Sequence, residues 1–81
     1  MRRQRKEARS TGLVRSFDQE EGWGVIDGPD VPGGCFVHFS HILGEGYRWL
    51  DPGEDVEFTH HPFPQDGCAH SATKAWRATS R

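Results

Sequence analysis

Hydrophobic side chains alternate with polar or small ones in several short stretches of the chain. Such stretches begin near residues 13, 22, 35, 55 and 68. A period of two is the pattern of a β-strand with one buried face. The last stretch, residues 68–77, is the least regular, because alanine and serine dilute its alternation. The pattern therefore predicts five short strands.

Turn-forming segments separate these stretches. They read DQEEG at 18–22, DGPDVPGG at 27–34 and PFPQDG at 62–67. A longer connection, residues 40–54, has room for one helical turn around residues 40–43. With 81 residues the chain has the length of one domain. Short strands without a convincing helix predict an all-β domain, and closure into a barrel would remove its exposed edges.

Two of the predicted strands carry large rings at alternate positions. Side chains on a strand alternate between its faces, so Ile26, Cys35 and Val37 are predicted to face the core. If the strands are neighbours, the other face gathers Trp23, Val25, Phe36 and His38. From alternation alone, these rings could equally be core residues of a small protein. Exposed together, they would form a binding surface suited to stacking unpaired bases.

Charge is divided unevenly along the chain, although the formal net charge is only −2. Residues 1–15 contain six basic side chains and one acidic one, whereas residues 16–81 contain four basic and eleven acidic ones. Residues 1–11 have almost no apolar side chains, so we predict that they form a disordered basic arm on a mildly acidic body. Arms of this kind suit contact with phosphate.

Three motifs follow one another along the chain: GLVRSF at 12–17, GWGVI at 22–26 and CFVHFSHI at 35–42. They resemble the opening strand and the two RNP motifs of the cold-shock domain family. GEGYRWLDPGEDVEF at 44–58 matches the region that follows. The resemblance covers residues 11–73. It implies a five-stranded antiparallel OB-fold barrel over residues 12–78, between the arm at 1–11 and a tail at 79–81, that binds single-stranded RNA or DNA.

The resemblance also implies which side chains contact nucleic acid. Trp23 and Phe36 would be the central stacking groups, and His38 would stack or donate a hydrogen bond. The full set of candidates is Arg15, Phe17, Trp23, Phe36, His38, Phe39 and Tyr47, with Arg2, Arg3, Arg5, Lys6 and Arg9 in the arm. Arg15 would contact phosphate, and Phe17 would support the surface. Phe39 and Tyr47 would extend it.

Some positions depart from the family pattern. Ser16 stands where the family usually has tryptophan, and Val25 stands where it has a second aromatic residue. Glu21 and Asp66 occupy positions that are often basic. Each lost stacking contact costs about 1–3 kcal/mol, and acidic groups weaken binding to a polyanion. We therefore expect weaker binding by the barrel than in a typical relative, with the arm as compensation.

Other chemistry fits the sequence less well. Five histidines and two cysteines would permit a zinc site, but Cys35 and His38 are three residues apart on a strand and face opposite ways. Ser40 beside His41 is a poor nucleophile–base pair. The loop at 27–34 lacks the lysine and the serine or threonine of a phosphate-binding P-loop. We expect no metal, no cofactor and no enzymatic activity.

Cellular setting and partners are inferred from what the chain contains. Two cysteines and no apolar run of membrane-spanning or signal-peptide length favour a cytoplasmic protein. We expect a monomer. The predicted function is single-stranded RNA or DNA binding, as an RNA chaperone or a regulator of transcription or translation. The alternative is a protein-interaction module that docks on RNA polymerase or a ribosome-associated factor. Trp49 and Trp76 lie outside the motifs, and packing is favoured for Trp49 alone.

Overall fold

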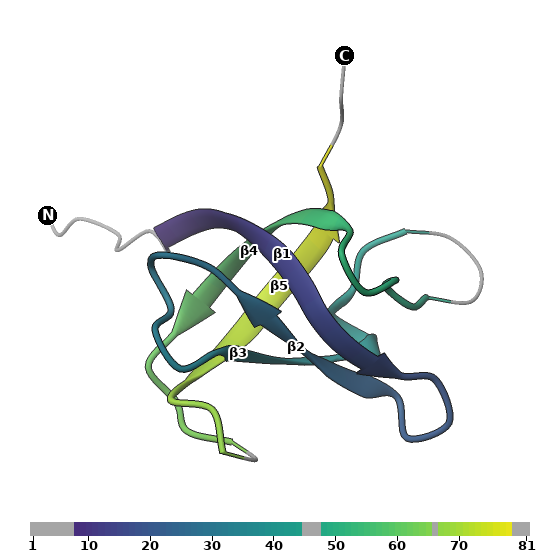
Figure 1. The fold of residues 1–81 in the computed structure, drawn as a ribbon, viewed down its shortest axis with the longest axis horizontal. Helices are drawn as coiled ribbons and strands as arrows, with labels where there is room; N and C mark the ends of the chain where they lie inside the picture. Colours follow the sequence, from purple (N-terminus) through teal and green to yellow (C-terminus); the bar gives the residue numbers. More distant parts are fainter. Residues whose placement is uncertain (1–7, 45–47, 66, 79–81) are drawn as a thin grey trace, which may run out of the picture.

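The described strands close into a single barrel (Figure 1). The computed structural model describes residues 8–44, 48–65 and 67–78. The elements are β1 (Ala8–Asp18), β2 (Trp23–Asp27), β3 (Cys35–His38), a 3-10 turn η1 (Phe39–His41), β4 (Asp55–His61) and β5 (His70–Arg77). The predicted all-β barrel is thereby confirmed. In this part of the chain, no helix is long and apolar enough to cross a membrane.

The strand order around the barrel is β1-β2-β3-β5-β4, and β4 closes it by pairing with β1. Four of these pairings are antiparallel, but β3 and β5 run parallel through Cys35↔His70 and Phe36↔Ser71. Strand directions can alternate around a closed ring only if the number of strands is even. A closed barrel of five strands must therefore contain a parallel pair, where the sequence predicted antiparallel strands throughout.

Strand β1 begins at Ala8, five positions before the Leu13 start that the hydrophobic pattern predicts. Its first half pairs with β4, from Ala8↔His60 to Leu13↔Asp55, and its second half pairs with β2. The register shifts at Arg15, where a bulge bends the strand from one partner to the other. Residues 8–11 of the predicted arm therefore belong to the barrel, while residues 1–7 lie outside the described residues.

Ser10 shows how a polar segment joins the barrel. Its side chain is buried, and its hydroxyl donates a hydrogen bond to Asp30 Oδ2 at 2.8 Å. His60 Nε2 lies 3.1 Å from the Ser10 hydroxyl oxygen. Backbone pairing and these side-chain contacts stabilise a strand end that carries no apolar alternation.

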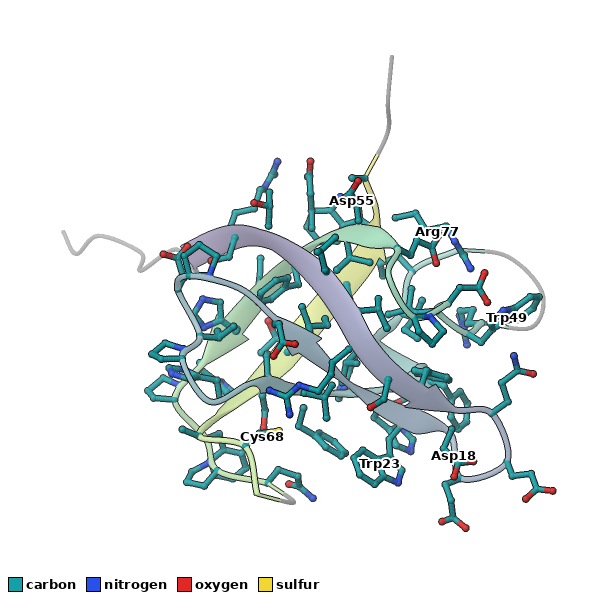
Figure 2. The ribbon with its side chains drawn as sticks, viewed as in Figure 1. Asp18, Trp23, Trp49, Asp55, Cys68 and Arg77 are labelled. Atoms are coloured by element: carbon teal, nitrogen blue, oxygen red, sulfur yellow. The ribbon has the colours of Figure 1, made fainter. Side chains whose placement is uncertain are left out.

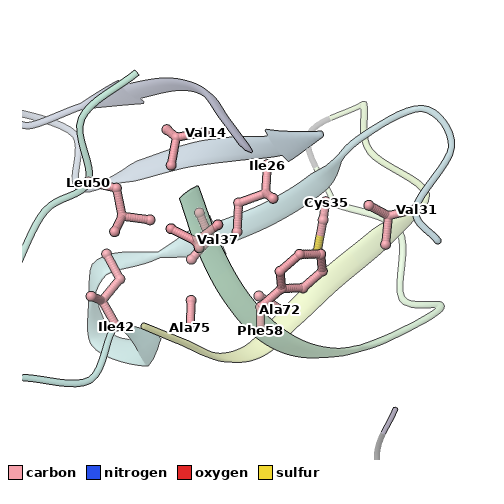
Figure 3. Packing of buried hydrophobic residues seen from close by; sticks show 11 residues of the cluster. Val14, Ile26, Val31, Cys35, Val37, Ile42, Leu50, Phe58, Ala72 and Ala75 are labelled. Carbon is pink, nitrogen blue, oxygen red and sulfur yellow. The ribbon is translucent and has the colours of Figure 1, made fainter. Parts of the chain in front are cut away.

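The core contains the residues that alternation assigned to it (Figure 3). Ile26, Cys35 and Val37 are completely buried. The whole cluster is Val14, Ile26, Val31, Cys35, Val37, Ile42, Leu50, Val56, Phe58, Ala72 and Ala75. Val31, Ile42 and Leu50 come from connections between strands and close the ends of the barrel. The helical turn expected at 40–43 is present as η1, one residue earlier.

Candidate nucleic-acid interface

Trp23 and Phe36 form a ring pair on the outside of β2 and β3. Their centroids are 5.4 Å apart and their planes differ by 27°, which is an offset-stacked arrangement. Both side chains are half-buried. Ile26, on the opposite face of β2 from Trp23, is completely buried. Figure 2 shows Trp23 pointing away from the barrel near the β1–β2 hairpin. Of the two alternatives left open by alternation, the structure shows the outward one.

His38 and Phe39 continue this ring surface. His38 lies opposite Trp23 in the β2–β3 register. Its ring centroid is 4.7 Å from that of Phe39, which is 43% exposed. We call Trp23, Phe36, His38 and Phe39 the stacking platform. Four rings from two paired strands and the adjoining turn are thus held at fixed spacing.

The hydrogen bonding of His38 fixes the tautomer of its neutral ring. Its Nδ1 accepts a hydrogen bond from the backbone N–H of Ser40 at 3.2 Å and lies 2.8 Å from the Ser40 hydroxyl oxygen. A backbone N–H can only donate, so Nδ1 is the acceptor and Nε2 carries the hydrogen. The imidazole therefore caps η1 with one nitrogen and can donate a hydrogen bond with the other.

Gly22 makes room for the last ring of the platform. A Cβ atom at Gly22 would lie 2.7 Å from the Phe39 ring, and the residue has φ +81°, where side chains are strained. The Phe39 N–H also donates to the Gly22 carbonyl at 2.8 Å. The glycine before β2 therefore positions a protein ring, and not a ligand, against the backbone.

Val25 is buried, contrary to the prediction that it lies exposed beside the rings. It is 8% exposed and stands outside the main core cluster. A Cβ added at Gly34 would meet Val25 Cγ1, Arg15 Nη2 and Cys68 Sγ. Side chains from β1, from β2 and from the segment before β5 therefore meet beside Gly34, and Val25 is buried there although the strand turns its side chain outward.

Phe17 supports the platform from β1. It is half-buried and packs against the core cluster. It also lines a surface hollow together with Ser16, Asp18 and Trp23. Ser16 is exposed and small, so the hollow lies where the family commonly places a tryptophan. The missing aromatic side chain leaves open surface at this end of the platform.

The β1–β2 hairpin places carboxylates beside this hollow. Asp18 lies opposite Trp23 in the strand register, and its Oδ1 accepts the backbone N–H groups of Glu20 and Glu21 at 2.9 Å each. All three acidic side chains are exposed. A polyanion approaching this end of the platform would be repelled.

Arg15 is already engaged by a carboxylate. Its guanidinium donates to both oxygens of Asp27, with Nε at 3.0 and 3.1 Å. The hydrogen bond from Arg15, helped by its charge, holds the pKa of Asp27 below the usual range, and desolvation opposes this only in part. The predicted phosphate-binding arginine is therefore partly neutralised within the protein.

Of the remaining predicted residues, Arg9 lies within the described part of the chain, and it is not brought to the platform. Arg9 lies in β1 with its guanidinium 5.5 Å from the ring centroid of Trp76 and 3.9 Å from Glu57, so it contacts β4 and β5. Tyr47 and the arm residues Arg2, Arg3, Arg5 and Lys6 lie outside the described residues. Their roles stay predictions.

The other two tryptophans are held at other places on the barrel. Trp49 Nε1 donates to Asp51 at 3.2 Å, and the Arg77 guanidinium lies 5.9 Å from the centroid of the Trp49 ring. Figure 2 labels both residues, with Arg77 at the end of β5. Trp76 Nε1 donates to Glu57 at 3.1 Å. Trp49 therefore packs as the sequence favoured.

Four side chains near the platform were not among the predicted site residues. Arg48 lines a groove with Phe17 and Phe39. His41, His61 and Phe63 line a second groove that begins at Phe36. The signal available in the sequence was HHPFP, because an aromatic residue between two prolines cannot continue a central strand.

The two cysteines are buried, and neither forms a disulfide in the described structure. Burial, with a smaller contribution from neighbouring Cys68, raises the pKa of the Cys35 thiol to about 12. A thiol that stays protonated at neutral pH is a poor nucleophile. Within the described ranges, no three histidine, cysteine or acidic side chains converge on a possible metal position.

Comparison with known proteins gives consistent matches. The sequence model of the "'Cold-shock' DNA-binding domain" family matches residues 10–75. The chain is 49% identical over 49 residues to cold shock-like protein CspB of Yersinia pestis, which covers 60% of this chain and 70% of that protein. It is 37% identical over 65 residues to the major cold shock protein of Micrococcus luteus, which covers 80% of this chain and 97% of that protein.

A solved structure supports the same assignment. The structure of drosophila Unr CSD456 superposes with a TM-score of 0.66 and 26% sequence identity. The match covers 90% of this chain but spans only 28% of the Drosophila chain. Together with the closed five-stranded barrel and the two RNP-like strands, these matches show that the chain belongs to the cold-shock DNA-binding domain family.

Proposed function

We propose that this protein binds single-stranded RNA or DNA by stacking unpaired bases on the stacking platform. The observation that carries the proposal is the offset-stacked pair of Trp23 and Phe36 on the outer face of β2 and β3. Membership of a family described as a DNA-binding domain supports it. Each base stacked on an aromatic side chain contributes about 1–3 kcal/mol.

The mechanism needs only binding energy. Rings held by paired strands do not have to be ordered when a base arrives, so little entropy is lost. His38 would add a hydrogen bond from Nε2 to a base edge or a phosphate oxygen. Because the protein would bind unpaired strands better than hairpins, it would shift RNA toward the open form without a cofactor and without catalysis. This is the action of an RNA chaperone or of a regulator of transcription or translation.

The affinity of the barrel alone should be modest. Ser16 and Val25 remove two stacking groups, and the hairpin carboxylates oppose a polyanion. Arg15 is occupied by Asp27. Sequence preference should also be weak, since every base has a face that can stack.

Binding of a labelled unstructured oligonucleotide, followed by fluorescence anisotropy at low salt, tests the proposal. Phe36→Leu keeps apolar bulk but removes the aromatic face. We expect this variant to bind roughly 5- to 100-fold more weakly, which corresponds to one lost stacking contact. Leu13→Ala is the matched control, because Leu13 is 49% exposed and lies away from the platform, beside Pro29 and Ala78. Equal binding by wild type and Phe36→Leu would contradict the proposal.

A second candidate function is docking on a protein such as RNA polymerase or a ribosome-associated factor. The occupied Arg15 and the three hairpin carboxylates favour it, since both weaken attraction for nucleic acid. If the folded wild-type protein shows no affinity for any unstructured oligonucleotide at low salt, this candidate replaces the first.

A further inference from the structure

We propose that Phe63 forms an additional base-binding subsite that extends the stacking platform across β3 toward β5. The subsite rests on the proposed function, because it serves the same single strand of nucleic acid. It would lengthen the binding track at the end opposite the acidic hairpin.

The subsite is a groove that adjoins the platform through a shared ring. Phe36 stacks on Trp23 on one side and lines this groove on the other. His41, His61, Phe63 and Gln65 complete most of its walls. The groove has a volume of about 300 Å³. A nucleic-acid strand whose bases stack on Trp23 and Phe36 reaches this groove without leaving the surface of the barrel.

Phe63 is held in place and still exposed. Its side chain is 58% exposed, the highest fraction among the large hydrophobic residues of the described chain. The buried Ser71 hydroxyl donates to the Phe63 carbonyl at 2.6 Å, and the Phe63 N–H donates to the His61 carbonyl at 2.8 Å. Its ring packs edge-on against His61, with centroids 5.4 Å apart and planes at 73°.

The loop that carries Phe63 is braced on both sides. Pro62 and Pro64 restrict the backbone around the ring. Gln65 and Cys68 exchange two backbone hydrogen bonds of 2.9 Å each, which closes the loop before β5. A ring fixed in this way loses little conformational entropy when it binds a base.

The described residues of this groove repel a nucleic-acid strand less than those of the hairpin do. Among the described residues that line the groove there is no carboxylate, and two imidazoles and one amide supply hydrogen-bonding groups. At the opposite end, Asp18 and Glu20 line the hollow beside Trp23, and Glu21 lines the neighbouring groove beside Phe39. A polyanion on the platform is therefore directed away from the hairpin and toward Phe63.

A length series of oligothymidylates from three to nine nucleotides tests the subsite. We expect Phe63→Ala to bind the shortest oligomers like wild type and the longest ones roughly 5- to 100-fold more weakly. Phe36→Leu should weaken binding at every length. Leu13→Ala serves as the control for loss of an exposed apolar side chain, and thermal melting checks that each variant is folded.

The possible results separate the two proposals. If Phe63→Ala equals wild type at every length while wild type binds, the subsite is wrong and Phe63 is left for a protein partner. If wild type binds no oligomer, the proposed function fails and the subsite fails with it. A loss that grows with oligomer length in Phe63→Ala, together with a loss at every length in Phe36→Leu, supports both.

Discussion

Arg15 and Asp27 show how a single ion pair can set the behaviour of a binding surface. Both side chains are half exposed, so their pairing adds little to folding stability. The pKa of Asp27 is lowered from its ordinary value of 3.8 by the hydrogen bond from Arg15. The carboxylate therefore stays charged at neutral pH, and the pair is lost only as pH falls through the lowered pKa. Near neutrality, Arg15 is available to phosphate only in competition with Asp27.

Replacing this carboxylate should release the arginine. We predict that Asp27→Asn binds an unstructured oligonucleotide more tightly than wild type. The slope of log affinity against log salt should steepen by about 0.7, the value for one phosphate contact with a single strand. Titrations over a series of salt concentrations measure both effects. The double variant Arg15→Gln, Asp27→Asn is the control and should lose the gain, whereas an unchanged affinity and slope in the single variant would count against a phosphate role for Arg15.

Strand β1 organises the barrel at the scale of elements. It pairs with β4 through its first half and with β2 through its second, and its bulge lies between the two. The second half places Phe17 and Ser16 beside the platform, and the first half holds Ser10 against Asp30. Loss of either half would open the barrel.

Two truncations distinguish the part of the predicted arm that belongs to the barrel. Removing residues 1–11 deletes the pairs from Ala8↔His60 to Thr11↔Glu57 and the buried hydrogen bond of Ser10. Loss of such a bond costs about 1–3 kcal/mol, and 1 kcal/mol shifts the melting temperature of a domain of this size by about 4–8 °C. We predict that this truncation melts several degrees lower, while removal of residues 1–7 leaves the melting temperature unchanged. Identical melting of the two would show that residues 8–11 add no stability.

Period-two alternation divided the residues of β2 and β3 correctly between an inner and an outer face, except at Val25, which is buried. Ile26, Cys35 and Val37 are inside, and Trp23 and Phe36 are outside. This succeeded because the paired strands keep a regular register, with Trp23 opposite His38. The family resemblance added the closed barrel, which alternation alone only suggested.

The rest depended on contacts between distant segments. Val25 meets Arg15 and Cys68 beside Gly34, although Cys68 lies 43 positions from Val25 in the sequence. Ser10 lies in a segment without apolar alternation, and its place in β1 follows from backbone pairing with β4. Phe63 joins the surface because β3 and β5 run side by side, and a local pattern does not report such a pairing.

On the scale of the whole molecule, rings and charges occupy different parts of the barrel. The platform lies on β2 and β3, with carboxylates at the hairpin end and imidazoles at the other. Arg9 and Arg15, the two described basic side chains of the first fifteen residues, both face carboxylates of the barrel. We therefore expect the barrel to contribute stacking more than charge, and the salt dependence of binding to come mainly from residues 1–7.

The emission of Trp23 as the sole tryptophan tests the central claim most directly. In the variant Trp49→Phe, Trp76→Phe, every change in tryptophan fluorescence reports the platform. Titration with an unstructured oligonucleotide at low salt should quench this emission in a saturable way, because a base stacks on the indole. If the folded variant keeps its emission unchanged while the oligonucleotide binds, the bases contact another surface and the stacking platform is not the binding site.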